Sequence, residues 1–201
     1  MKLIAVCTGV VTPMRYRTVG GDLRTVASGI SKAPVSSLEN PVSIEVKRLG
    51  IVGDEQCELA VHGGVSKAVY MMPWQHHDFW KRQLVKEGKP GVLNWGDLGE
   101  NLVVEGLSED IVCLGDEFEI GTARFRVTEP REPCFKFAIK MGYAAAPKQM
   151  VQAGNCGWYL SVLTPGVIQA GSPIAYLPQG NTTTVLRRFR ELTQKGQLNL
   201  L

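Results

Sequence analysis

The sequence lacks any paired arrangement of cysteines. Its 201 residues contain five cysteines, and no two of them form a CxxC pair. This argues against a disulfide framework, a zinc ribbon and an iron–sulfur site within the chain. A free cysteine is most often a small buried residue. Cys7 and Cys113, which stand among valine, isoleucine and leucine, are therefore expected to be buried fillers.

The sequence also lacks a strong charge of one sign and a long apolar run. Lysine and arginine number 22 against 19 acidic residues, a net charge of +3 with no basic stripe, so we expect no nucleic-acid partner. No apolar run approaches the length of a membrane span, and residues 1–16 read as a first strand rather than a signal peptide. We expect a cytoplasmic protein without a membrane partner.

Several common catalytic motifs are missing as well. The sequence has no HExxH pair, no Walker loop, no GxGxxG that opens a helix and no GxSxG elbow. These absences argue against a metalloprotease, a kinase, a nicotinamide dehydrogenase and a serine hydrolase.

Short strands separated by turns make up most of the sequence. The 22 glycines and 11 prolines are scattered, and the runs between them are short and rich in valine and isoleucine. In FEIGTARFRV, Gly121 and Thr122 separate two alternating stretches, which is typical of a hairpin. We expect a mainly β fold with a barrel-like core and a few peripheral helices.

Three stretches show helical patterns. Apolar residues recur at helical spacing from 73 to 86, and a shorter helix is expected from 147 to 153. The third is expected near 183–195, capped by Thr182 or Thr183 and ended by Gly196. One domain would then cover 1–180, with residues 181–201 as a helical tail packed on it.

The histidine pair His76-His77 suggests a metal site at first sight. Adjacent helical residues point about 100° apart, so the two side chains are poorly placed to chelate one ion. We expect surface or half-buried positions on the first helix for both.

The stretch TEPREPCFK places one cysteine between two cations. Two prolines should end the preceding strand near Thr128, which leaves Cys134 on a rigid loop. Arg131 and Lys136 favour a thiolate, whereas Glu132 opposes it. A thiolate is both a nucleophile and a soft metal ligand. The residues alone leave a functional and a structural Cys134 equally open.

Two glycine turns also carry polar residues. His62, Gly63 and Gly64 precede Lys67, and two adjacent glycines allow close backbone approach to an anion. Asn101 follows another turn, where an asparagine usually bonds the local backbone. Taken singly, both stretches are better explained as ordinary turns.

The order of these pieces carries more information than any one of them. GDEQ, VHGG with a cation three residues on, LGENL, EPREPC and GWYLSVLTPGVIQAG follow one another between residues 53 and 175. This ordered set resembles the MOSC domain, named for the C-terminal domain of molybdenum cofactor sulfurases. Within that superfamily it is most similar to the stand-alone bacterial YiiM type, which is linked to resistance against N-hydroxylated purines. The turn Gly171-Ser172-Pro173 departs from the glycine–aspartate pair of many members.

The resemblance implies a barrel-like fold that binds the molybdenum cofactor, a pterin dithiolene (molybdopterin) that carries a phosphate. It implies that Cys134 is the catalytic residue and the metal ligand. The residues implied to contact the cofactor are His62, Gly63, Gly64, Lys67, Asn101, Arg131 and Lys136.

The activity implied is the molybdenum-dependent reduction of small N-hydroxylated compounds. Because the chain carries no recognisable flavin, nicotinamide or iron–sulfur motif, a separate electron-donating reductase is expected as a partner. Two alternatives stay open: a sulfur carrier with a persulfide on Cys134, and a non-catalytic carrier of the cofactor. Formation of a homodimer is also open.

Overall fold

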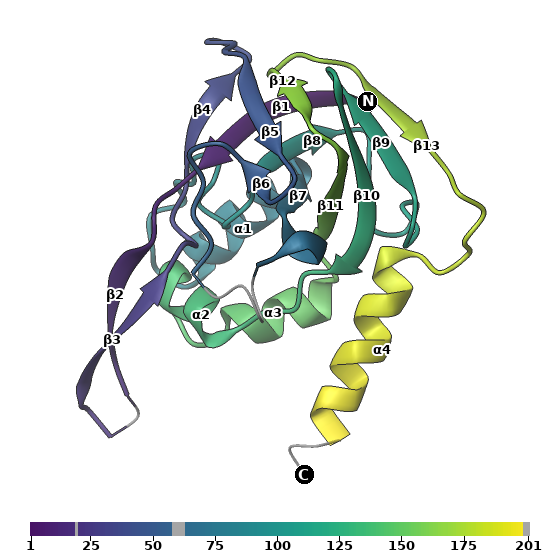
Figure 1. Ribbon diagram of the computed structural model, residues 1–201. Coiled ribbons are helices and arrows are strands. Elements are labelled where there is room, and N and C mark those ends of the chain that lie inside the picture. Colours follow the sequence, from purple (N-terminus) through teal and green to yellow (C-terminus); the bar gives the residue numbers. More distant parts are fainter. Residues whose placement is uncertain (19, 58–62, 199–201) are drawn as a thin grey trace.

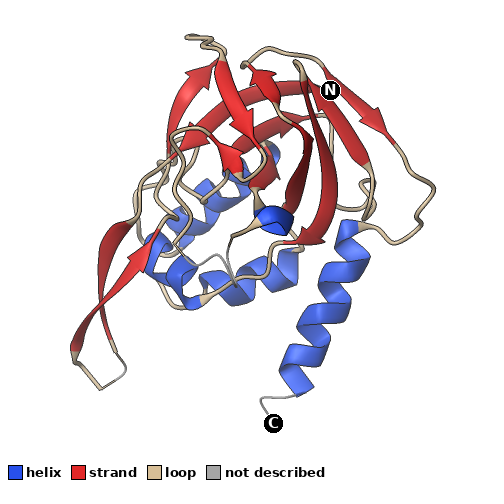
Figure 2. Cartoon of the chain, in the orientation of Figure 1, coloured by secondary structure: helices blue, strands red, loops and turns tan. Residues whose placement is uncertain are grey.

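A curved eight-stranded sheet forms the body of the protein (Figures 1 and 2). The computed structural model describes residues 1–18, 20–57 and 63–198, with side chains described as far as residue 194. All neighbouring strands are antiparallel except β7 and β8, which are parallel and are joined through helix α1. In order across the sheet, the strands are β13 (Ile174–Leu177), β9 (Glu117–Ile120), β10 (Ala123–Pro130), β11 (Trp158–Thr164), β7 (Val69–Pro73), β8 (Leu102–Glu105), β1 (Lys2–Thr8) and β4 (Ala33–Ser37).

Two smaller sheets and a few helices complete the fold. The first small sheet has the order β12 (Gly166–Ile168), β5 (Ile44–Lys47) and β6 (Gly50–Ile51), and the second pairs β2 (Thr12–Arg17) with β3 (Leu23–Ser28). The helices are η1 (Val65–Lys67, a 3-10 turn), α1 (Gln75–Lys86), α2 (Phe135–Met141), α3 (Ala146–Ala153) and α4 (Val185–Leu198). The predicted mainly β class with peripheral helices is confirmed.

The main sheet curls without closing into a barrel. Its edge strands, β13 and β4, form no ladder with each other among the described residues. Instead, the start of β1 bonds the turn before β13: the amide of Leu3 donates to the Ser172 carbonyl at 3.0 Å, and that of Gly171 donates to the Leu3 carbonyl at 2.7 Å. The Gly171-Ser172-Pro173 turn therefore serves here as a backbone link across the curl.

The strand predictions that rest on local pattern are confirmed. The N-terminal run forms β1, and Gly121 with Thr122 connects β9 to β10 with the pairing Ala123↔Ile120. Gly121 has a φ of 57°, which a residue with a side chain adopts at a cost. The hydrophobic core lies between the sheet and the helices, and its largest fully buried side chains are Trp80, Trp158, Phe118, Phe125, Phe137 and Phe189.

The helix predictions are confirmed with shifted ends. Proline 73 ends β7 rather than opening α1. Helix α3 ends at Gly154, which has a φ of 74° and supplies the left-handed cap. Helix α4 begins after Thr184, whose hydroxyl accepts the Arg187 amide at 3.1 Å, so the predicted cap at Thr182 or Thr183 is wrong. It also continues past Gly196, which was expected to end it.

The tail helix is attached through an apolar stripe at its N-terminal half. Val185 and Phe189 are fully buried in the core, while the far end projects from the body (Figure 1). Within the part of the chain that the structure describes, no helix is long and apolar enough to cross a membrane.

Candidate functional site

The segment after β10 carries the cysteine that the sequence singled out. The strand runs to Pro130, two residues beyond the expected end, with the pairing Pro130↔Trp158. On the β9 side, the backbone bonds of β10 end at Val127, which bonds Asp116 and Gly115; beyond it, the described residues show no ladder there as far as Pro130. Proline is tolerated at such an edge because no ladder bond is lost there.

Cys134 stands at the N-cap position of α2, a helix that the sequence analysis did not predict. Helix α2 has seven residues and ends at Gly142, whose φ of 75° is that of a left-handed C-cap. The spacing of Phe137 and Met141 above this glycine was the available signal. The backbone is extended at Cys134 and becomes helical at the next residue, and the thiol lies at the wall of a pocket, only partly buried.

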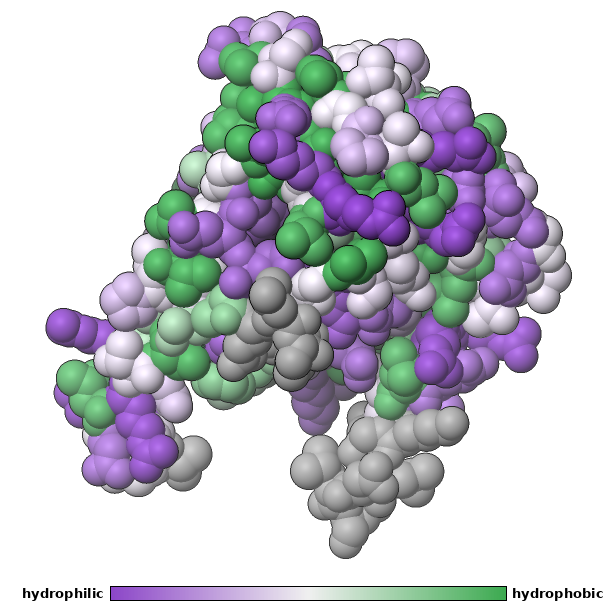
Figure 3. Space-filling model, in the orientation of Figure 1, coloured by the Kyte–Doolittle hydropathy of each residue, from purple (hydrophilic) through white to green (hydrophobic). Residues whose placement is uncertain are grey.

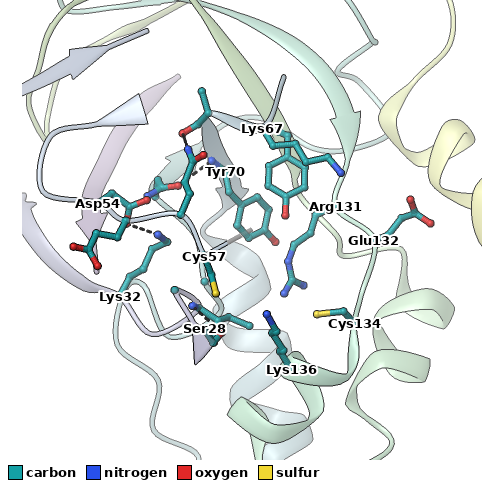
Figure 4. A pocket seen from close by; sticks show the side chains of 18 residues that line it. Ser28, Lys32, Asp54, Cys57, Lys67, Tyr70, Arg131, Glu132, Cys134 and Lys136 are labelled. Carbon is teal, nitrogen blue, oxygen red and sulfur yellow. Dashed lines mark hydrogen bonds and ion pairs between the residues drawn. The ribbon is translucent and has the colours of Figure 1, made fainter. Parts of the chain in front are cut away.

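That pocket gathers side chains from distant parts of the chain (Figure 4). It encloses about 100 Å³. Four of the candidate side chains line it together: Cys134, Arg131, Lys136 and Lys67. Asn101 lies in the same wall. The remaining lining residues are Ser28, Gly29, Ile30, Lys32, Asp54, Glu55, Gln56, Cys57, Ala68, Tyr70, Gly99, Glu132 and Tyr159.

Arg131 is a buried cation without a carboxylate partner among the described residues. It is only 5% exposed, and its guanidinium carbon lies 4.8 Å from the Phe137 ring centroid and 5.3 Å from that of Tyr70. One guanidinium nitrogen contacts the Met150 sulfur at 3.4 Å. Ring faces and a thioether stabilise a cation only weakly compared with an anion. The positive charge of Arg131 is therefore available to an anionic ligand in the pocket.

The phenols beside Arg131 stay neutral. Burial raises the pKa of Tyr70 well above its usual value, and burial also raises the pKa of Tyr159 despite the nearby guanidinium. Burial acts to lower the pKa of Arg131, but the negative charges that Tyr70, Tyr159 and Cys134 carry once they ionise at high pH outweigh this and raise it. Arg131 therefore remains charged.

Two lysines complete the cationic side of the pocket. Lys136, on α2, is 6% exposed. Lys67, at the end of η1, lies 3.5 Å from Glu129 and 5.5 Å from the Tyr159 ring centroid. In Figure 4 the ammonium of Lys136 points between the sulfur atoms of Cys57 and Cys134.

The opposite wall was not predicted as part of the site. Lys32 forms an almost fully buried ion pair with Asp54, and Asp54 also accepts the Gly9 amide at 2.9 Å. Cys57, two residues beyond Glu55, lines the same cavity with a partly exposed thiol. The GDEQ motif pointed to Asp54 as a site residue. Nothing in the sequence indicates that Lys32, Tyr70 or Tyr159 lies in the same pocket.

The two glycines expected at the cofactor lie behind the pocket rather than in its wall. The Gly64 amide donates to Gln56 Oε1 at 2.7 Å. A side chain on Gly63 would approach the same Gln56 oxygen to 2.4 Å. Gln56 in turn bonds the carbonyls of Leu49 and Ala68. These contacts position the wall through Gln56. His62 lies outside the described residues.

The side-chain amide of Asn101 is already bonded at both ends. Its oxygen accepts the Tyr70 amide at 3.0 Å, and its nitrogen donates to the Cys7 carbonyl at 3.1 Å. Asn101 thereby joins β7 to β1 beneath the pocket. This is the local backbone bonding that asparagine in a turn commonly performs, extended here to two strands.

The expectation that His76 and His77 are surface or half-buried residues is wrong. Both are buried, and they point to different carboxylates: His76 lies 2.8 Å from Glu109, and His77 lies 2.8 Å from Glu100. The carboxylates come from loops far along the chain, which helical periodicity cannot reveal. Among the described residues, no group of three or more histidine, cysteine or acidic side chains could hold a metal ion.

The other cysteines divide by burial. Cys7 and Cys156 are fully buried, and burial raises the pKa of both thiols. Cys113 is partly exposed, so the prediction of a buried filler is confirmed for Cys7 and wrong for Cys113.

Comparison with known proteins identifies the family. The MOSC domain family matches residues 58–175, which is more than half of the chain. The chain belongs to the MOSC domain family. It is 35% identical over 164 residues to the uncharacterized protein YflK of Bacillus subtilis, covering 82% of this chain and 70% of YflK. It is 32% identical to protein YiiM of Escherichia coli, covering 75% of this chain and 66% of YiiM.

A solved YiiM structure agrees over nearly the whole chain. The crystal structure of YiiM from Geobacillus stearothermophilus superposes with a TM-score of 0.71 at 30% identity, covering 96% of this chain and 84% of that one. The chain is therefore YiiM-like in sequence and in fold. A protein of Gibberella moniliformis named reductase is 34% identical over 157 residues, but this chain covers 27% of that protein.

Proposed function

We propose that this MOSC protein binds the molybdenum cofactor through Cys134 and reduces small N-hydroxylated compounds. The observation that carries the proposal is the pocket in which the Cys134 thiol lies beside Arg131, a buried cation without a carboxylate partner among the described residues. Thiolate is a ligand suited to soft metals, and a desolvated guanidinium is suited to phosphate.

The chemical groups in the pocket suit the cofactor, but the volume of the pocket is small for it. Cys134 offers the sulfur ligand, Arg131 and Lys136 offer two buried cations, and Lys67 offers a third near the rim. Ligand cavities usually have volumes of roughly 300 Å³ or more. This pocket encloses about 100 Å³. In this form the pocket would therefore hold only part of the cofactor.

When bound, the cofactor would supply two electrons and accept the oxygen of the N–O bond. The overall reaction is R–NHOH + 2 H⁺ + 2 e⁻ → R–NH₂ + H₂O, so the N–O bond breaks and the nitrogen gains a proton. The protein's residues hold and orient: Cys134 fixes the metal, Arg131 and Lys136 hold the anion, and Tyr70 and Tyr159 exclude water from that side. The reductase name of one relative agrees with an oxidoreductase.

The test is expression in a host that makes the cofactor, followed by molybdenum and pterin analysis and an assay with 6-hydroxylaminopurine and reduced methyl viologen. We expect bound molybdenum and turnover. Persulfide on Cys134 without molybdenum would indicate the sulfur carrier instead, and bound molybdenum without turnover would indicate the cofactor carrier.

The decisive variant is Cys134→Ser, with Cys113→Ser as the matched control. Cys134 is partly exposed at a helix end, so serine should preserve the fold. Turnover should fall by about 100-fold or more because a hydroxyl is a harder and far less acidic ligand. Cys113 does not line the pocket, and its variant should keep wild-type turnover. Wild-type turnover by Cys134→Ser would refute thiolate ligation.

A further inference from the structure

A two-stranded arm projects from the body beside the pocket. We call β2 and β3 together the arm; Figure 1 shows it extending away from the main sheet. Among the residues that the structure describes, the two strands pair only with each other, and most of their side chains are exposed. A ribbon of two strands is marginally stable in isolation, so an exposed one of this kind is suited to contact with another molecule.

The arm carries uncompensated positive charge. It presents Arg15, Arg17 and Arg24, and all three are exposed. Asp22 is the only acidic residue between positions 12 and 28. Among the described residues, none of the three arginines has a carboxylate at ion-pair distance, and Arg17 donates only to the Gly21 carbonyl at 3.1 Å.

The arginines occupy both faces of the ribbon. Arg24 pairs with Tyr16, whereas Arg15 pairs with Thr25 and Arg17 with Leu23, so Arg15 and Arg17 lie on the face opposite to Arg24. In the view of Figure 3, hydrophilic side chains make up much of the far end of the arm. A positive projection of this kind attracts an acidic partner from several directions.

The base of the arm leads directly to the pocket. Ser28, at the end of β3, and the next two residues, Gly29 and Ile30, line the cavity. On the near face, the Tyr16 ring lies 5.8 Å from the ring of Phe135. Phe135 directly follows Cys134 and is 53% exposed. A protein that contacts the arm would therefore also contact an exposed ring one residue from the candidate metal ligand.

We propose that the arm and Phe135 form the docking surface for an acidic electron-transfer protein. This inference rests on the proposed function, in which each turnover consumes two electrons that come from outside the chain. Two reduced donor molecules, each oxidised by one electron, would supply them. Interfaces between electron-transfer proteins bury little surface and depend on complementary charge. The arm offers positive charge for such an interface next to the site.

A second copy of the chain is a poorer occupant for the same surface. Each copy carries a net charge of +3 and the same three arginines, so two arms would repel. Complementary charge therefore favours an acidic partner over self-association through the arm.

The test uses an acidic flavodoxin as the probe donor and the cofactor-loaded protein. The variant Arg15→Gln/Arg17→Gln/Arg24→Gln removes three positive charges from exposed positions, where substitutions change stability little. Its control, Arg187→Gln/Arg188→Gln/Arg190→Gln, removes three charges from α4. Binding is measured by surface plasmon resonance at low and high salt, and turnover is measured with reduced flavodoxin and with reduced methyl viologen.

We expect the arm variant to bind flavodoxin about tenfold more weakly at low salt, with a reduced salt dependence, and to keep its viologen-driven turnover. The α4 variant should bind nearly as the wild type does. The docking proposal is overturned if the arm variant keeps wild-type affinity, if both variants weaken equally, or if the wild type does not bind flavodoxin at low salt. A sedimenting mass of the arm variant below that of the wild type would instead indicate that the arm joins two copies of the chain. Absence of viologen-driven turnover in the wild type would refute the proposed function itself.

Discussion

Charged groups are buried in two regions of this molecule, beneath α1 and in the pocket around Arg131, and the two regions differ in the partners that they provide. Beneath α1, His76 faces Glu109 and His77 faces Glu100, each pair 2.8 Å apart. The carboxylates also accept backbone amides: Glu109 accepts that of Gly157 at 2.7 Å. Both carboxylates there meet partners supplied by the chain.

At the pocket, Arg131 meets the Phe137 ring, the Met150 sulfur and two neutral phenols, those of Tyr70 and Tyr159. Burying a charge without a partner costs roughly several kcal/mol of folding free energy. A fold retains such a charge where it serves a purpose other than stability. We infer from the contrast that the groups beneath α1 maintain the fold, whereas Arg131 maintains a binding site at some cost to stability.

Replacement of Arg131 by methionine should have the largest effect on binding. The side chains are similar in length, but the charge for the anion is lost. The molybdenum and pterin content after expression in a cofactor-making host should fall by about tenfold or more, since loss of one partner of a buried charge pair typically costs about 2–5 kcal/mol. Arg126→Met, which removes a half-exposed partner of Glu117, is the control and should retain the cofactor.

Arg131→Met also tests the contrast between the two regions when the protein is free of cofactor. The free energy of unfolding of Arg131→Met should then lie within about 1 kcal/mol of wild type, or above it, because no carboxylate is left behind. A strongly destabilised Arg131→Met would mean that the guanidinium supports the core.

Glu100→Gln should give the largest loss of stability. Glu100 is fully buried, accepts the amides of Gly96 at 2.6 Å and Leu98 at 3.0 Å, and faces His77. Breaking a buried pair costs about 3 kcal/mol or more, which urea unfolding would detect. Glu119→Gln, on an exposed carboxylate, should change the free energy of unfolding by less than about 1 kcal/mol. A cost below that value for Glu100→Gln as well would remove the distinction between the two regions.

The smallest expected effect is a pH dependence at Cys7. Burial, followed by the charge of Glu100, raises the pKa of this thiol, so the folded state keeps its proton longer than the unfolded state does. The associated stability is complete below the unfolded pKa, near 9, and is lost as the pH rises above it, by at most about 1.4 kcal/mol per pH unit for one group.

Cys7→Ala should therefore flatten the fall in the free energy of unfolding between pH 8 and pH 10. Val103→Ala removes volume from the same small cluster without a titrating group, so it should lower stability equally at both values. Equal pH slopes in the wild type and in Cys7→Ala would show that this thiol does not contribute.

Local pattern predicted the elements whose causes are local. The hairpin at Gly121 and the short helix before Gly154 follow from turn and cap chemistry in adjacent residues. Helix α2 was missed because seven residues carry too little periodicity to identify a helix. The burial of His77 was missed because its partner, Glu100, comes from a separate loop.

The candidate site divides in the same way. Arg131, Cys134 and Lys136 are neighbours in sequence and could be proposed together. Lys32, Tyr70 and Tyr159 join them only because the curl of the sheet brings β7, β11 and the segment after β3 to one cavity. The periodicity of a single sequence carries no information on such contacts between residues that are distant in the chain.

The bonding of β1 sets the order in which the chain can fold during synthesis. This first strand pairs with β8 and also exchanges backbone bonds with residues 171 and 172. A ribosome must therefore release nearly the whole chain before the first strand can find its last partners. Pairing at such long separation is slow, even though β4 and β8 can pair with β1 earlier. We expect completion of the sheet to be a late event that follows synthesis.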